Sequence, residues 1–187
     1  VNLLIFPALA GLALAIPKVI NVYPQYQKWS DAVVPLWLYL ANFGFGAATT
    51  PLVNAFNAVG KVKLNLKLMV MWTVLTWVTV PTLAKLYGAN GAAFGLLIVS
   101  ASSVIAWALV KREFNINLLK TIGLPFLLTL VMVAGLILLN QVLPNTIIGL
   151  IGLVLSGALI YTGLSLIAVK EELVWFYSSL KKVVVKQ

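Results

Sequence analysis

The sequence predicts an all-α protein whose helices cross a membrane, and three observations lead to this prediction. Hydrophobic residues make up 62% of the 187 residues and charged residues only 9%, whereas soluble proteins average about 25% charged residues. The 49 residues from Thr121 to Val169 contain no Lys, Arg, Asp or Glu. Elsewhere the charged residues separate apolar segments of about 20 residues, the length of helix that crosses a bilayer core roughly 30 Å thick.

The apolar segments divide the chain into six expected membrane spans. The long uncharged stretch has one polar break, Asn140-Gln141 followed by Pro144-Asn145, and therefore predicts two spans joined by a tight turn. Residues 170–187 are expected to form either a cytoplasmic amphipathic helix on the membrane surface or a continuation of the last helix into water. The six expected spans are residues 3–17, 33–57, 68–84, 92–110, 119–139 and 146–169.

The distribution of Lys and Arg predicts the orientation of the spans. Connections 58–67 and 111–120 and the tail carry three, three and four Lys or Arg residues, ten in all, against three on the other side, Lys18, Lys28 and Lys85. Cytoplasmic connections carry the excess of these residues in membrane proteins. We therefore expect a multi-pass plasma-membrane protein with a cytoplasmic C-terminus. Because the basic residues form no continuous stripe, no nucleic-acid partner is expected.

The chain lacks the residue types that most enzyme chemistry requires. It contains no Cys and no His, which removes thiolate chemistry and the usual zinc ligands. The four acidic residues, Asp31, Glu113, Glu171 and Glu172, lie in connections or in the tail, and no ionisable group is expected inside a span. We therefore expect no enzyme activity, no catalytic, cofactor or metal site, and no carboxylate that couples ion flow to transport.

The second expected span differs from the others because polar residues share one of its faces. On a helical wheel, seven of its residues fall within an arc of roughly 140°. Amide and hydroxyl groups are costly in hydrocarbon, so this face must meet either other helices, through hydrogen bonds, or a water-filled cavity. Tyr39 and Gly46 belong to this face. The other five are the candidate cavity-lining residues: Asn42, Thr49, Thr50, Asn54 and Asn57.

Prolines lie in or near several expected spans. A proline removes a backbone N–H and bends a helix. Bent helices are frequent in transporters, although membrane helices in general also contain them. The prolines concerned are Pro7, Pro17, Pro35, Pro51, Pro81 and Pro125.

Two short motifs resemble one superfamily of transporters. The segment LVNAFNAVGKVK at residues 52–63 ends a span with a small-residue Gly-Lys turn, and LYGANGAAFG follows the next span at residues 86–95. Together they resemble polysaccharide flippases of the multidrug/oligosaccharidyl-lipid/polysaccharide exporter superfamily. In that family one helix ends in a Gly-Lys turn, and the next ends in Tyr-Gly shortly before Gly-Ala-Ala.

The resemblance implies both a fold and a function. Family members with fourteen helices have two six-helix lobes facing a central cavity, followed by an extra helix pair. The six spans would then be the C-terminal lobe of a two-lobed transporter plus that pair. The implied substrate is a polyprenyl-linked sugar, such as an O-antigen precursor, and the implied partners are membrane lipids and an N-terminal half. Because Val1 already lies in an apolar stretch, the chain is expected to be a piece of a longer protein.

Three functions are compared at this stage. The first is flipping of lipid-linked oligosaccharides by alternating access, with no substrate-binding residue carried over from the family by motif. The second is a multidrug–cation antiporter of the same fold, which usually requires an acidic residue inside the membrane. The third is a membrane glycosyltransferase or polymerase, which needs catalytic acids or a long extramembrane loop, whereas the longest outer connection, residues 18–32, is short.

Overall fold

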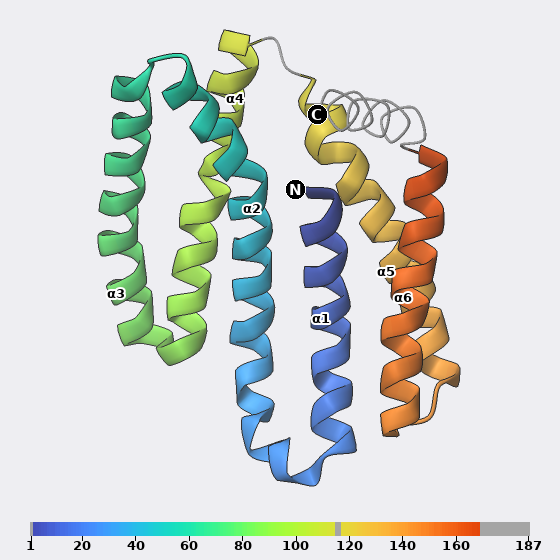
Figure 1. Ribbon diagram of the computed structural model, residues 1–187. Coiled ribbons are helices and arrows are strands. Elements are labelled where there is room, and N and C mark those ends of the chain that lie inside the picture. The colour runs from blue at the N-terminus through green and yellow to red at the C-terminus, as the bar shows by residue number, and fades with distance from the viewer. Residues whose placement is uncertain (1, 115–116, 169–187) are drawn as a thin grey trace, which may run out of the picture.

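The protein is a bundle of helices, and the computed structural model describes residues 2–114 and 117–168. No strand occurs within these two ranges, which confirms the expected all-α class. Residues 170–187, for which a cytoplasmic amphipathic helix was one expectation, lie outside the described residues. The elements in chain order are α1 (Asn2–Val22), the 3₁₀ helix η1 (Pro24–Ala32), α2 (Val33–Ala58), α3 (Val62–Ala101), α4 (Ser103–Phe114), the π-helical turn η2 (Leu119–Gly123), α5 (Leu124–Val142) and α6 (Ile147–Ala168) (Figure 1).

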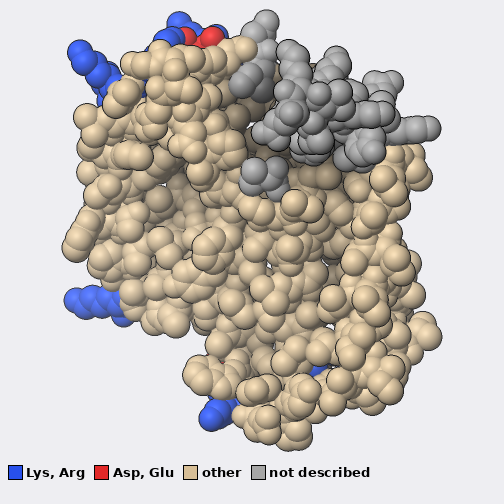
Figure 2. Space-filling model, in the orientation of Figure 1, with Lys and Arg blue, Asp and Glu red and all other residues tan. Residues whose placement is uncertain are grey.

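Five helical stretches are long and apolar enough to cross a membrane. On the face shown in Figure 2, the charged atoms gather toward the two ends of the molecule, and the broad region between them carries none. This is the surface of a helical membrane bundle, in which apolar side chains face lipid. The stretches are Asn2–Val22, Pro24–Ala58, Val62–Phe114, Leu119–Val142 and Ile147–Ala168.

The longest of these stretches folds back on itself at Gly88. This residue has φ 61° and ψ −139°, a conformation that glycine adopts without the steric cost of a Cβ. A Cβ at Gly91 would collide with the carbonyl of Leu83, and a Cβ at Gly95 would lie 3.1 Å from Cα of Val80. The chain after Gly88 therefore runs back beside the first part of α3 (Figure 1). The Tyr-Gly motif is the turn of this helical hairpin.

The two ends of the bundle differ in their connections. Lys61, after α2, forms an ion pair with Glu113, at the end of α4, so both connections lie at one end, called here the basic end. The opposite end, called the far end, carries η1, the Gly88 turn and the turn between α5 and α6 (Figure 1). Connections that alternate in their Lys and Arg content along the sequence thus lie at opposite ends of the bundle.

The helices form two packed clusters, and α1 lies between them, in contact with α2 and with α5 and α6. Phe56 of α2, which is fully buried, is the centre of a cluster formed by α2, α3 and α4. A second cluster joins α5 and α6, and Leu3, Ala10 and Leu14 of α1 pack against it. The first group consists of Leu52, Val53, Phe56, Leu68, Ala106 and Val110, and the second of Leu128, Met132, Leu136, Leu153 and Tyr161.

Two prolines free backbone carbonyls that other helices then use. Pro17 has no N–H to donate to Ala13 O, four residues earlier, and Nε1 of Trp37 in α2 donates to that carbonyl at 2.9 Å. Pro125 likewise has no N–H for the carbonyl of Thr121, and Nδ2 of Asn2 in α1 donates to it at 3.2 Å. Each proline therefore creates an acceptor for a contact between helices.

We expect Trp37 and Pro17 to be energetically coupled. Trp37→Phe keeps an aromatic ring but removes the donor to Ala13 O, and should lower the free energy of unfolding by about 1 kcal/mol. In a Pro17→Ala background, the helix regains its own N–H for that carbonyl, so the same change should cost clearly less. A double-mutant cycle of unfolding in detergent measures this coupling. Equal costs in both backgrounds would contradict the assignment.

The polar face of α2 as the candidate functional site

Helix α2 lies between α1 on one side and α3 and α4 on the other (Figure 1), and it carries all five candidate cavity-lining residues. Its apolar residues Leu52, Val53 and Phe56 are buried against α3 and α4. The polar residues of the stripe lie beside this buried surface, so some of them reach the neighbouring helices and others do not.

Thr49 and Asn42 are hydrogen-bonded to the part of the helical hairpin that follows Gly88. The Thr49 side chain is 5% exposed, and its hydroxyl accepts a hydrogen bond from Nε1 of Trp107 at 2.9 Å while donating to Phe45 O at 2.7 Å. The Trp107 ring stacks on Phe45, with centroids 5.8 Å apart. The amide oxygen of Asn42 accepts a hydrogen bond from the hydroxyl of Ser100. Both polar groups thus join α2 to its neighbour.

Asn57 has a similar partner near the basic end. Its Oδ1 accepts a hydrogen bond from Nδ2 of Asn65 at 2.8 Å. Asn65 is buried in the first turns of α3, so this bond ties the end of α2 to the start of α3.

Thr50 and Asn54 remain on the surface of α2. The Thr50 hydroxyl donates only to Gly46 O of its own helix, at 2.8 Å, and the Asn54 amide makes no hydrogen bond to any residue in the described ranges. Gly46 and Phe43 are exposed on the same face, and all four lie within about 80° of one another on the wheel. We call Phe43, Gly46, Thr50 and Asn54 the α2 strip.

The structure therefore gives the five residues different surroundings. Asn42, Thr49 and Asn57 make hydrogen bonds to neighbouring helices, as the packing interpretation expects. Thr50 and Asn54 offer free hydrogen-bonding capacity, and the lining of a cavity remains a prediction for them. Within the described ranges, no group of three or more metal-ligating side chains comes together.

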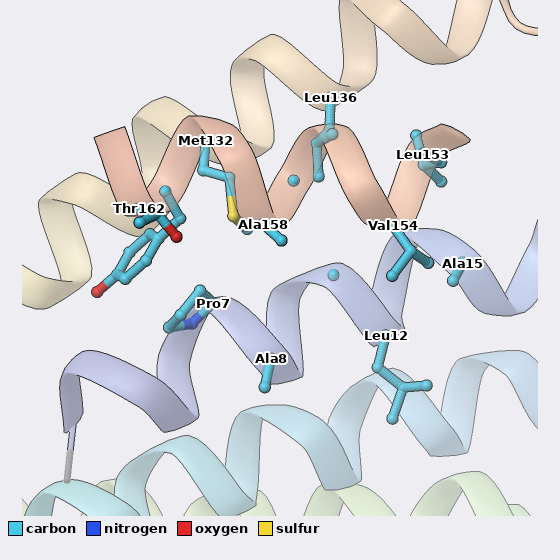
Figure 3. A pocket seen from close by; sticks show the side chains of 13 residues that line it. Pro7, Ala8, Leu12, Ala15, Met132, Leu136, Leu153, Val154, Ala158 and Thr162 are labelled. Carbon is cyan, nitrogen blue, oxygen red and sulfur yellow. The ribbon is translucent and has the colours of Figure 1, made fainter. Parts of the chain in front are cut away.

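A cleft lies elsewhere, between α1, α5 and α6. Its volume is about 410 Å³ and its lining is mainly apolar, with Tyr161 and Thr162 as the residues that carry hydroxyl groups. In Figure 3, Met132 and Leu136 of α5 and Val154 of α6 lie on the side of α1 that faces α6, whereas the Leu12 side chain points away from Val154. Space remains beside Gly11 of α1, where nothing lies within 4 Å of the position that a Cβ would take, whereas Gly157 of α6 packs closely on Leu136. Sequence reasoning missed this cleft because small residues at such spacing equally allow close packing.

Lys18 is buried, which the sequence did not indicate. We expected the first span to end at residue 17 and no ionisable group to lie within a span, yet α1 continues to Val22 and the Lys18 side chain is only 3% exposed. Its Nζ donates to Oδ1 of Asn140 at 2.9 Å and to the carbonyl of Leu143 at 3.3 Å. These two acceptors, at the end of α5 and in the turn that follows, take the place of water around the ammonium.

No protein-family model, curated protein or solved structure matches the chain. The chain is a helical membrane bundle, and any more specific function has to be argued from its own residues.

Thr49 and Thr50 are adjacent, and we expect them to differ in their contribution to stability. Thr49→Val removes the acceptor of the Trp107 bond, and an average hydrogen bond between membrane helices contributes about 0.6 kcal/mol. Thr50→Val removes a bond only within its own helix and should leave stability nearly unchanged. Reversible unfolding in mixed micelles measures both. Equal losses for the two variants would contradict the assignment of Thr49 to packing.

Proposed function

We propose that this chain is the C-terminal part of a flippase for lipid-linked oligosaccharides. The observation that carries the proposal is the α2 strip, an uncharged surface with an unbonded amide at Asn54 and an exposed hydroxyl at Thr50. Sugar hydroxyls are neutral donors and acceptors, and neutral amides and hydroxyls are the side chains that match them. The exposed ring of Phe43 adds an apolar surface about two turns from Thr50 and about three turns from Asn54.

The position of the strip supports loading from the cytoplasm. Thr50 and Asn54 lie in the half of α2 nearer the basic end, whereas Phe43 lies toward the far end. The excess of Lys and Arg at the basic end is typical of a cytoplasmic surface. A glycan entering from that side would meet the polar part of the strip first.

In this proposal the chain crosses the plasma membrane six times. The two legs of the Val62–Phe114 stretch cross separately, and α5 and α6 form the extra helix pair that follows the lobe. An N-terminal half supplies the opposite wall of the cavity, and rocking of the two halves exposes the strip first to one side and then to the other. The motifs at residues 52–63 and 86–95 agree with this plan, since the first forms the α2–α3 turn and the second the Gly88 turn.

The alternative of a multidrug–cation antiporter has less support. The α2 strip holds no carboxylate, and the two acidic residues in the described ranges, Asp31 and Glu113, lie at the ends of the bundle. Glu113 is already paired with Lys61. A cation-binding site would therefore have to come from the other half.

Asn54→Leu tests the proposed function in the full-length transporter. Loss of one hydrogen bond worth about 0.5–1.5 kcal/mol should reduce transport per folded molecule roughly two- to tenfold. Thermal stability should change little, because Asn54 has no hydrogen-bond partner among the described residues. Flipping of a lipid-linked oligosaccharide in proteoliposomes measures the rate.

Asn90→Leu is the matched control for Asn54→Leu. Asn90 is an exposed Asn at the far end, beyond the Gly88 turn, and its loss should change neither quantity. Normal flipping by Asn54→Leu, or transport of cationic drugs in place of glycan, would overturn the proposed function.

Cysteine labelling tests the orientation. These 187 residues contain no Cys, so in a full-length protein freed of any other Cys, Val62→Cys at the basic end and Asn90→Cys at the far end each provide a single thiol. In intact cells a membrane-impermeant maleimide should label only the Asn90→Cys variant, and both variants should react after permeabilisation. Labelling of Val62→Cys in intact cells would contradict the cytoplasmic assignment of the basic end.

A further inference from the structure

We propose that α5 and α6 form a hairpin that opens away from α1 at the far end, and that Lys18 is the latch that holds it closed. The latch consists of Nζ of Lys18 and its two acceptors, Oδ1 of Asn140 and the carbonyl of Leu143. This device lies in the fold itself and goes beyond the proposed function.

The buried ammonium of Lys18 has only neutral partners. No carboxylate in the described ranges pairs with it, since the ion pair found there joins Lys61 to Glu113. A buried cation is costly unless hydrogen-bonded partners replace its water. Both partners of Lys18 come from the end of α5 and the turn that follows. When this turn moves away from α1, the Lys18 ammonium therefore loses both of its hydrogen-bond acceptors.

Lys18 also has a second way to be solvated. It lies four residues before Val22, the last residue of α1, close to the far end of the bundle. A Lys stem is long enough to carry its ammonium to a nearby water boundary while the methylenes stay in apolar surroundings. Opening therefore exchanges Asn140 and Leu143 for water without leaving the charge unpaired in hydrocarbon. Both the closed and the open position satisfy the ammonium, which a two-position latch requires.

The other end of the hairpin is held in place and can act as the hinge. Leu118 and Ile122 pack against the α2–α4 cluster, while Leu124 packs against the α5–α6 cluster. Asn2 of α1 donates to the carbonyl of Thr121 in the same segment. The segment is the π-helical turn η2, a wider and weaker geometry that often occurs where helices adjust.

Between hinge and latch, the contact with α1 is incomplete. The 410 Å³ cleft lies along α1 from Pro7 to Ala15, one turn short of Lys18. Atoms that line a void lose part of their dispersion attraction, so the middle of this interface contributes less than a filled one. The hairpin is thus held at η2, packs on Ala10 and Leu14 of α1 with the cleft left unfilled beside them, and is hydrogen-bonded again at Lys18.

The experiment measures opening by the reactivity of a buried thiol. In a cysteine-free background of the full-length protein in vesicles, Ala15→Cys places a single thiol in the cleft at a position that is 8% exposed. Lys18→Met keeps a long side chain but removes the latch, and should raise the labelling rate by a membrane-permeant maleimide about fivefold, which corresponds to about 1 kcal/mol of opening free energy.

Ala106→Cys is the matched control, because Ala106 is equally small and is fully buried in the α2–α4 cluster. Its labelling rate should not change on Lys18→Met. Asn140→Leu should raise the labelling rate of the thiol at position 15 as Lys18→Met does. Lys18→Arg keeps a charged donor, so the labelling rate should stay close to the rate measured with Lys18. An unchanged rate at Ala15→Cys in both Lys18→Met and Asn140→Leu would overturn the latch, as would an equal rise at Ala106→Cys, which indicates general loosening.

Discussion

The whole arrangement depends on one constraint, namely that a polar group in hydrocarbon must find a partner inside the protein. The constraint acts most visibly on the carbonyls of Ala13 and Thr121, which Pro17 and Pro125 leave without their helical donors. Trp37 and Asn2 supply the missing donors. Both bonds involve α1, the helix that contacts α2 on one side and α5 and α6 on the other. Unsatisfied backbone thus becomes the means by which separate helices are joined.

The same constraint explains why the polar face of α2 is not uniform. Where the hairpin of α3 and α4 lies close, the side chains of Asn42 and Thr49 are hydrogen-bonded to Ser100 and Trp107. On the adjoining face no helix in the described ranges supplies a partner for Asn54. A surface of this kind is expensive beside lipid and stable beside water or a hydrated glycan. This contrast is the physical basis of the proposed substrate surface.

Helix α1 combines two kinds of contact that differ in strength along its length. Its contact with α2 includes the Trp37 bond, whereas its contact with α5 and α6 is interrupted by the apolar cleft. Lys18 stabilises the far end of the second contact through charge-assisted bonds. The contact of α1 with α5 and α6 is therefore fixed near η2, interrupted at the cleft and hydrogen-bonded at Lys18. Such an interface can separate at the far end without disturbing the α2–α4 cluster.

The sequence by itself determined the all-α class and the positions of most helices, because both follow from local hydrophobicity and charge. It also indicated the reversal near Gly88 and the turn after Asn140, where glycine, proline and amide residues interrupt apolar runs. Only the tertiary structure decided which polar residues pair, since Thr49 and Trp107 are 58 residues apart and Lys18 and Asn140 are 122 apart. The cleft was equally beyond local reasoning, because a small residue next to another helix gives either a close contact or a void. Which of the two occurs depends on the side chains that the partner helix presents.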